Sequence, residues 1–167
     1  MRKSNSIIAI RYHAIPLRRS PLDNPQSLRV ESSTEIRNQL SVSSRKVIVL
    51  VGPTASGKTA ISLELAKLLN GEIISADSRQ IYRHLTIGTA KPTQDQLTQV
   101  KHHFVDELLP DQYFSAGEFG EKGRSVIDHI LSRAKIPIVV GGSGLYVRSL
   151  IDGLFEGPAA DEEFRDV

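Results

Sequence analysis

Lys58 and Thr59 close a stretch of the chain whose residue types are suited to binding a diphosphate or a triphosphate. Its two glycines let the backbone turn N–H groups toward phosphate oxygens. Lys58 adds a mobile cation, and the Thr59 hydroxyl is placed to bind Mg²⁺. The stretch does not indicate which reaction the bound phosphate compound undergoes. It fits the pattern G-x-x-x-x-G-K-[ST] and consists of Gly52, Pro53, Thr54, Ala55, Ser56, Gly57, Lys58 and Thr59.

The segments on either side of this loop supply the context that the motif requires. Residues 46–51 form a short apolar run rich in β-branched side chains, which is typical of a buried strand. Residues 60–69 carry apolar side chains at helical spacing, and the start of a helix offers free N–H groups and a positive dipole end. This context favours a phosphate-binding loop over a glycine-rich turn without a ligand.

Asp77 is a second candidate for chemistry, because it directly follows the strand-like residues 72–76. A carboxylate at that place can hold Mg²⁺ through water or accept a proton from a substrate nucleophile. The alternative is an aspartate that only caps a helix or a turn. Ser78 and Gln80 are able to hydrogen-bond a base or a sugar.

Other polar residues are weaker candidates. Lys91 can reach a phosphate, although an exposed loop lysine is the commoner case. His102 and His103 are adjacent and would point to opposite faces of a strand, so we interpret them as structural and not as a metal pair. Residues 141–144 are Gly-Gly-Ser-Gly, which either bring the backbone close to a ligand or only form a turn.

Strand and helix signals alternate from residue 46 onward. Further strands are predicted at 72–76, 103–105 and 136–140, and further helices at 116–134, capped by Ser115 with Glu118, and from residue 143. Such alternation predicts an α/β fold, a P-loop NTPase-like parallel sheet flanked by helices, with ligands at the carboxyl ends of the strands. Residues 156–167 are polar and add no closing strand, so we expect the sheet to be incomplete at its C-terminal end.

Charge is unevenly distributed over the 167 residues, whose net charge is +2. Residues 1–45 hold eight basic and three acidic side chains, whereas residues 46–167 hold 13 and 16. We interpret residues 1–45 as a disordered extension; a transit peptide and a basic arm for nucleic acid are the alternatives. We interpret residues 46–167 as a truncated P-loop transferase core. There is no cysteine and no apolar run of about 18 residues, so we expect a cytoplasmic protein without a membrane span.

Five blocks, in order along residues 46–158, closely resemble the tRNA dimethylallyltransferases, also called tRNA isopentenyltransferases. The resemblance is closest to bacterial-type members. The blocks are residues 52–59 (GPTASGKT), 74–83 (ISADSRQIYR), 87–93 (IGTAKPT), 102–106 (HHFVD) and 140–146 (VGGSGLY).

The resemblance implies transfer of a dimethylallyl group from dimethylallyl diphosphate to N6 of adenine 37, next to the tRNA anticodon. Residues 52–59 would hold the diphosphate with Mg²⁺ at Thr59, and Asp77 would be the catalytic residue. The residues that fall where the family contacts the tRNA anticodon loop are Asp77, Ser78, Arg79, Gln80 and Ser143. We further expect a monomer.

Two departures qualify the resemblance. Family members are considerably longer, and a helical insertion that grips the anticodon stem follows the region where this chain ends. Three alternatives therefore stay open: an adenylate isopentenyltransferase acting on free AMP, an inactive fragment that binds the donor, and a P-loop small-molecule kinase. The kinase would need a lid rich in arginine, and the sequence has no such cluster.

Overall fold

A computed structural model describes the backbone of residues 6–11 and, with side chains, residues 46–53 and 55–153. Its strands are β1 (Ser6–Arg11), β2 (Lys46–Val51), β3 (Gly71–Ser75), β4 (His102–His103) and β5 (Ile136–Gly141). Its helices are α2 (Lys58–Leu69), α3 (Gln94–Gln99), α4 (Ala116–Ser132) and α5 (Gly144–Asp152).

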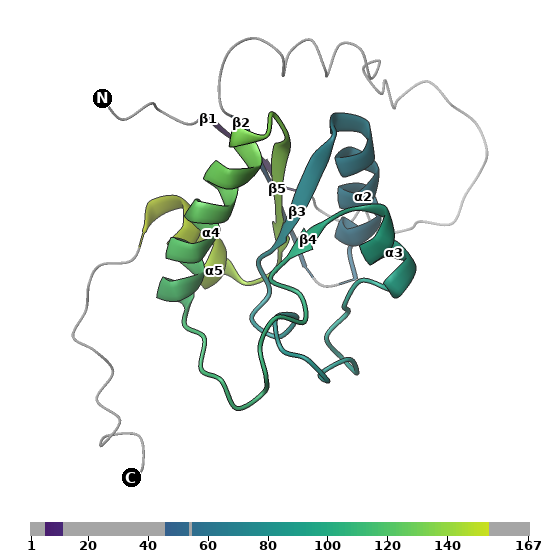
Figure 1. Cartoon of the computed structure of the whole chain (residues 1–167), viewed down its shortest axis with the longest axis vertical. Helices are drawn as coiled ribbons and strands as arrows, with labels where there is room; N and C mark the ends of the chain where they lie inside the picture. Colours follow the sequence, from purple (N-terminus) through teal and green to yellow (C-terminus); the bar gives the residue numbers. More distant parts are fainter. Residues whose placement is uncertain (1–5, 12–45, 54, 154–167) are drawn as a thin grey trace, which may run out of the picture.

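The strands form one parallel sheet in the order β1-β2-β5-β3-β4. Helices α2 and α3 lie on one face of the sheet, and α4 and α5 lie on the other (Figure 1). Strand β5 lies between β2, which precedes the glycine loop, and β3. Because all three strands are parallel, their carboxyl ends are neighbours at one end of the sheet. The predicted parallel α/β sheet flanked by helices is confirmed.

Side chains of the central strands alternate between the two faces, so the sheet separates two apolar clusters. The cluster under α2 contains Ile48, Ile73 and Ile138. The cluster under α4 and α5 contains Val49, Ile74 and Val139. All six side chains are buried. The continuous apolar runs in the sequence reflect this burial on both faces, as expected of parallel strands.

Helix α4 begins with the predicted capping box. The Glu118 backbone N–H donates to Ser115 Oγ at 3.1 Å, and the Ser115 N–H donates to Glu118 Oε2 at 3.0 Å. Its glycines allow α5 to approach closely, because a Cβ at Gly120 would lie 2.3 Å from Ser149 Oγ and one at Gly123 would lie 2.6 Å from Leu150. The position of α5 after β5 therefore depends on two small residues.

Two described elements were not predicted. Strand β1 lies within the segment interpreted as a disordered extension, where residues 6–11 pair with β2 from Ser6 opposite Lys46. Helix α3 is polar and has no buried residue; its Thr93–Gln96 capping box is the local feature that marks its start. The strand predicted at 103–105 corresponds to β4, which begins one residue earlier, at His102, and already ends at His103. The interpretation of residues 1–5 and 12–45, and the expected incompleteness after residue 153, fall outside the described residues.

Candidate active site

A cavity of about 440 Å³ opens at the carboxyl ends of β2, β3 and β5. This volume is in the range of about 300–1,000 Å³ that is usual for small-molecule sites. The residues of the phosphate loop that line it are Ala55, Ser56, Gly57, Lys58 and Thr59. From the strand ends it is lined by Ser75, Asp77, Gly141 and Gly142. The predicted loop and the predicted aspartate therefore share one cavity.

The backbone of the loop has the conformation that its glycine pattern predicts. Gly57 has a φ of 87° and precedes α2, and Ala55 has a φ of 61°. Left-handed conformations come at little cost only for glycine, so Gly57 is needed at that point. Thr54 lies outside the described residues, and Gly52 and Pro53 are described at the end of β2 but are not part of the cavity wall.

Lys58 lies at the first turn of α2 and folds back over the loop. Its Nζ donates to the Pro53 carbonyl oxygen and, at 3.3 Å, to Ser56 Oγ. Partial burial lowers the pKa of Lys58 below its ordinary value, and the negative charge of Asp77 opposes this shift. The lysine and the aspartate, 19 positions apart in the sequence, therefore interact electrostatically across the cavity.

Asp77 is half-buried at the end of β3 and has a turn role as well as a place in the cavity. Its Oδ1 accepts a hydrogen bond from the Arg79 backbone N–H at 2.9 Å. The two interpretations of this residue are therefore compatible, because one carboxylate oxygen fixes the turn while the side chain lines the cavity. A carboxylate held in this way can accept a proton from a bound nucleophile.

The residues predicted to contact tRNA divide into two groups. Ser78 and Arg79 are exposed and stand outside the cavity wall, as does half-buried Ser143, whose N–H donates to the Ala76 carbonyl oxygen at 3.3 Å. Asp77 and Gln80 line the cavity itself. The side chain of Gln80 is bonded to Ser75 and to the backbone of Thr89 and Ala90.

Lys91 differs from both of its sequence-based interpretations. It is not an exposed loop lysine, because only 6 % of its side chain is accessible. Its Nζ lies 2.6 Å from Asp106 Oδ1 and also donates to the Tyr82 carbonyl oxygen. Lys91 thus ties the loop after β3 to the loop after β4, and it is not among the residues that line the cavity.

His102 is a cavity residue that the sequence did not reveal. It lies on β4 and lines the cavity together with Gln96 of α3, while His103 points to Glu72, as expected for neighbours in a strand. His102 Nδ1 donates to the Val100 carbonyl oxygen at 2.8 Å. Burial lowers the pKa of His102, so the ring stays neutral near pH 7 and its Nε2 is an acceptor. The sequence alone did not indicate which of the two adjacent histidines would face the cavity.

The residues around the cavity would fit a magnesium ion. The Thr59 hydroxyl and the Asp77 carboxylate both line it, and Mg²⁺ prefers such oxygen ligands. Within the described part of the chain, no group of three or more acidic or histidine side chains is placed to hold a metal by itself. Protein oxygens supplemented by substrate phosphates are the usual arrangement for Mg²⁺.

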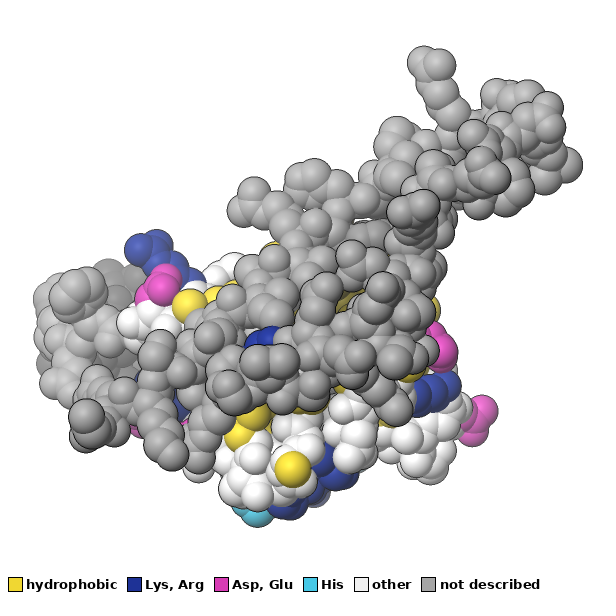
Figure 2. All heavy atoms as spheres, turned by 90° about the horizontal axis from the view of Figure 1, so that it is seen from above, with side chains coloured by type: hydrophobic (Ala, Val, Ile, Leu, Met, Phe, Trp, Pro, Cys, Tyr) yellow, Lys and Arg dark blue, Asp and Glu magenta, His cyan; other side chains and the backbone are white. Residues whose placement is uncertain are grey.

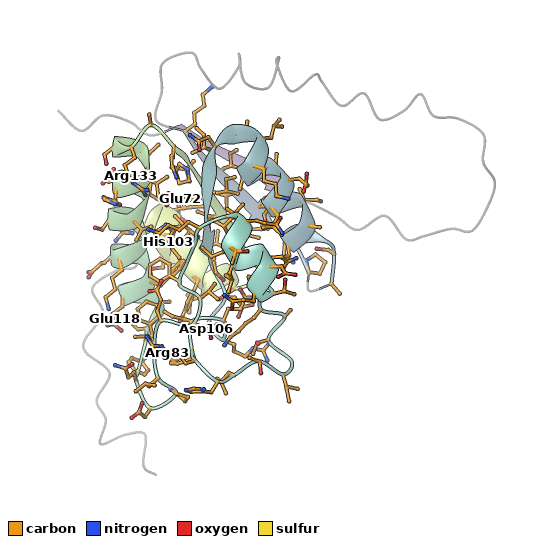
Figure 3. All side chains as sticks on the ribbon, turned by 45° about the vertical axis from the view of Figure 1, so that its right-hand side comes forward. Glu72, Arg83, His103, Asp106, Glu118 and Arg133 are labelled. Atoms are coloured by element: carbon orange, nitrogen blue, oxygen red, sulfur yellow. The ribbon has the colours of Figure 1, made fainter. Side chains whose placement is uncertain are left out.

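A buried ionic cluster lies at the opposite end of the sheet. Glu72, at the start of β3, is 1 % exposed and is bonded to Arg133, Lys135 and His103 at 2.7–2.9 Å. Figure 3 shows Glu72, His103 and Arg133 together, away from Arg83 and Asp106 near the cavity end of the molecule. This cluster fixes β3, β4 and the end of α4, and it contributes no group to the cavity.

The described surface adds little information about partners. Acidic side chains lie beside basic ones at both sides of the view in Figure 2. Among the residues that the structure describes, no helix combines the length and the apolar character that crossing a membrane requires.

Comparison with known sequences finds similar proteins over most of this chain. A family model described as IPP transferase matches residues 80–167. A tRNA dimethylallyltransferase 2 of Syntrophus aciditrophicus is 55% identical over 125 residues, which are 75% of this chain and 40% of that protein. A tRNA dimethylallyltransferase of Thermodesulfovibrio yellowstonii is 54% identical over 121 residues, 72% of this chain and 38% of that protein. The chain thus spans about two fifths of the length of these curated relatives.

Solved structures agree with this result. The tRNA isopentenylpyrophosphate transferase of Bacillus halodurans matches with a TM-score of 0.65 and 44% identity, over 74% of this chain and 41% of that chain. A eukaryotic dimethylallyltransferase acting on tRNA matches with a TM-score of 0.64 and 31% identity, over 74% of this chain and 32% of that chain. The fold resemblance therefore extends beyond bacterial relatives.

Proposed function

The chain belongs to the IPP transferase family, and from that premise we propose that it transfers a dimethylallyl group from dimethylallyl diphosphate to N6 of adenine 37 in tRNA. The observation that carries the proposal is the shared cavity. It combines a loop suited to a diphosphate with a carboxylate, Asp77, at the adjacent strand end. The names of the relatives support tRNA as the acceptor.

The loop would hold the donor by its diphosphate. Backbone N–H groups at the start of α2 and the Lys58 ammonium neutralise the charge that the diphosphate gains when the allylic C–O bond breaks. A bound Mg²⁺, held by Thr59 and phosphate oxygens, would supply further neutralisation of the same charge. The electron pair of the broken bond leaves with the diphosphate.

Asp77 would act on the acceptor. The N6 amine of adenine attacks the allylic carbon with its lone pair, so a nitrogen–carbon bond forms as the carbon–oxygen bond breaks. The amine then has one proton too many, and the Asp77 carboxylate is placed to accept it. An exocyclic amine is a weak nucleophile, so alignment with the donor matters as well as the base. The adenine must leave its stack in the anticodon loop to reach the cavity.

Further properties belong to the same proposal. The chain would act as a monomer in the compartment that holds its tRNA, which we expect to be the cytoplasm. Gel filtration with light scattering tests the first of these expectations. A mass near the chain's 18.4 kDa is expected, and a stable dimer would contradict it.

The experiment that tests the proposal measures incorporation of label. Purified protein with Mg²⁺ and radiolabelled dimethylallyl diphosphate is incubated with unmodified tRNA or with AMP, and Asp77→Ala is run in parallel. Label in tRNA that is lost in the variant supports the proposal. Label in AMP identifies an adenylate isopentenyltransferase. Donor binding without transfer to either acceptor limits the chain to holding the donor, and ATP turnover identifies a kinase.

A further inference from the structure

The side-chain amide of Gln80 is hydrogen-bonded within the protein, which leaves little of it available to contact RNA. Its Nε2 donates to the carbonyl oxygens of Thr89 and Ala90 at 3.1 and 3.0 Å, and its Oε1 accepts from Ser75 Oγ at 2.8 Å. A glutamine amide has only two N–H donors, so both are in use within the protein. One oxygen lone pair is all that remains for another partner.

The segment that receives these bonds has a strained backbone. Ala90 has a φ of 48° and Gly88 has a φ of 73°. A left-handed alanine is costly, and such residues persist where the surrounding structure fixes them. Thr89 adds to this, because its buried hydroxyl donates to the Leu85 carbonyl oxygen at 2.7 Å. The segment Leu85–Lys91 is thus held in one conformation by several side chains.

The same segment forms part of the cavity. Ala90 of this segment lines it, next to Pro92, which follows the segment, and Gln80, together with the phosphate loop and Asp77. At its far end the segment is fixed by Lys91, which is paired with Asp106, and Arg83 Nε donates to the Asp106 carbonyl oxygen at 2.9 Å. Figure 3 shows Arg83 and Asp106 close together at this end of the molecule. Gln80 links Ser75 at the end of β3 to Thr89 and Ala90 of the segment.

We propose that Gln80 is a positioning residue, whose amide fixes the Thr89–Ala90 turn as a wall of the cavity, and that it does not contact RNA. This assignment differs from the one that the family resemblance implied for Gln80. Its importance for donor binding rests on the proposed function, whereas its effect on the Thr89–Ala90 turn does not. Ser75 extends the link into the buried strand, so the turn is connected to the core of the sheet.

Two variants separate the bonds. Gln80→Leu removes all three hydrogen bonds and replaces the side chain by one of similar size. Gln80→Glu keeps the acceptor for Ser75 but places an oxygen against the two carbonyl groups that receive the Nε2 hydrogens. Matched controls are Gln99→Leu, at an exposed position at the end of α3, and Ile130→Val, a core change in α4 away from the cavity. The second control separates a local effect from a general loss of stability.

The first measurement needs no ligand. Backbone ¹⁵N order parameters of residues 85–91 are compared among the five proteins. In the wild type they are expected near 0.85, and in both Gln80 variants they are expected to fall below about 0.6. The controls should keep the wild-type values. Unchanged order parameters in Gln80→Leu would overturn the proposal.

The second measurement compares affinities for magnesium pyrophosphate and for an unmodified tRNA anticodon stem-loop. The Gln80 variants should bind pyrophosphate about two- to tenfold more weakly than the wild type and the controls. A loss confined to the stem-loop would show that Gln80 contacts RNA and would also overturn the proposal. If the wild type binds neither probe, the proposed function fails, while the order parameters still decide whether Gln80 fixes the turn.

Discussion

Gly141 and Ala76 lie so close that no side chain fits between them: a Cβ on Gly141 would be 2.1 Å from the Ala76 carbonyl oxygen. The contact joins the last residue of β5 to the residue that follows β3. The Ala76 N–H also donates to the Val140 carbonyl oxygen at 2.8 Å. Since Asp77 comes next in the chain, this contact sets where the carboxylate emerges at the edge of the sheet.

We therefore expect Gly141→Ala to disturb both stability and the cavity. Forcing a methyl group into this contact should lower the free energy of unfolding by about 1–3 kcal/mol. Urea unfolding measures the loss, and pyrophosphate titration measures the effect on the cavity. Gly144→Ala is the matched control, because a Cβ there meets nothing within 4 Å. Equal behaviour of the two variants would show that the close contact is unimportant.

Lys58→Met tests the cation of the loop. A hydrogen bond between an ammonium and a phosphate contributes about 1.5–3 kcal/mol, so affinity for magnesium pyrophosphate should fall roughly 10- to 150-fold. Lys67→Met on the same helix is the control, since Lys67 is exposed and paired with Glu64. Calorimetric titration at pH 7 compares the three proteins. A similar affinity in the wild type and Lys58→Met would remove Lys58 from the binding site.

The pKa of Lys58 also predicts a pH dependence. Because partial burial lowers this pKa, the ammonium should lose its proton at a lower pH than an ordinary lysine does. The alkaline decline in the wild-type affinity for pyrophosphate should therefore occur at a lower pH than an ordinary lysine would give, and Lys58→Met should lack this decline. Titrations from pH 7 to 10 give the comparison. A decline of the same size in both proteins would assign it to another group.

Asp77→Asn tests the role of Asp77 as a base separately from its role in the turn. Asparagine retains an oxygen that can accept from the Arg79 N–H, so the turn should persist. Asparagine cannot accept the proton, and dimethylallyl transfer should fall about 10²- to 10⁴-fold. Pyrophosphate binding should persist, because removal of the Asp77 charge does not weaken attraction for an anion, and the Thr59 hydroxyl and the phosphate oxygens would still hold Mg²⁺. Full transfer activity in Asp77→Asn would exclude the carboxylate as the base.

Glu72→Gln tests the ionic cluster at the other end of the sheet. Burial alone would raise the pKa of Glu72, but hydrogen bonds from Arg133, His103 and Lys135 hold it well below its ordinary value. The folded state therefore binds fewer protons than the unfolded state just below the unfolded pKa of about 4.3. The stabilisation by Glu72 is present above that pH and is lost as the pH falls toward the folded value.

For Glu72→Gln we expect a loss of about 3 kcal/mol at pH 7, because the cationic partners lose their buried carboxylate. The further loss of stability below pH 4.3 should be smaller in the variant than in the wild type. Urea midpoints between pH 3 and 7 measure both effects, with Glu64→Gln at an exposed ion pair as the control. A parallel decline in Glu72→Gln and the wild type would assign acid sensitivity elsewhere.

Much of the fold followed from local patterns in the sequence. The glycine loop, the apolar strand runs and the Ser115–Glu118 capping box each act within a few residues, so their structures could be predicted. The place of Asp77 at the cavity could be predicted for the same reason, since it closely follows a strand. Strand β1 was missed because its short apolar run gains its place only by pairing with β2, far along the chain.

The parts of the site that were missed depend on contacts between distant segments. Lys91 and Asp106 are 15 residues apart, and neither sequence context indicates their pairing. The bonds of Gln80 to the Thr89–Ala90 turn and the position of His102 at the cavity likewise depend on how the loops after β3 and β4 fold over the sheet. Motif matching located these residues in the sequence but not their partners.

The most direct test of the central claim is a comparison of ligands for the cavity by calorimetry in the presence of Mg²⁺. We predict that dimethylallyl diphosphate binds at about one site per chain, is displaced by pyrophosphate, and binds more tightly than ATP. Binding should be roughly 10- to 150-fold weaker in Lys58→Met and should be retained in Asp77→Asn. Tight binding or turnover of ATP together with no binding of dimethylallyl diphosphate would contradict the account.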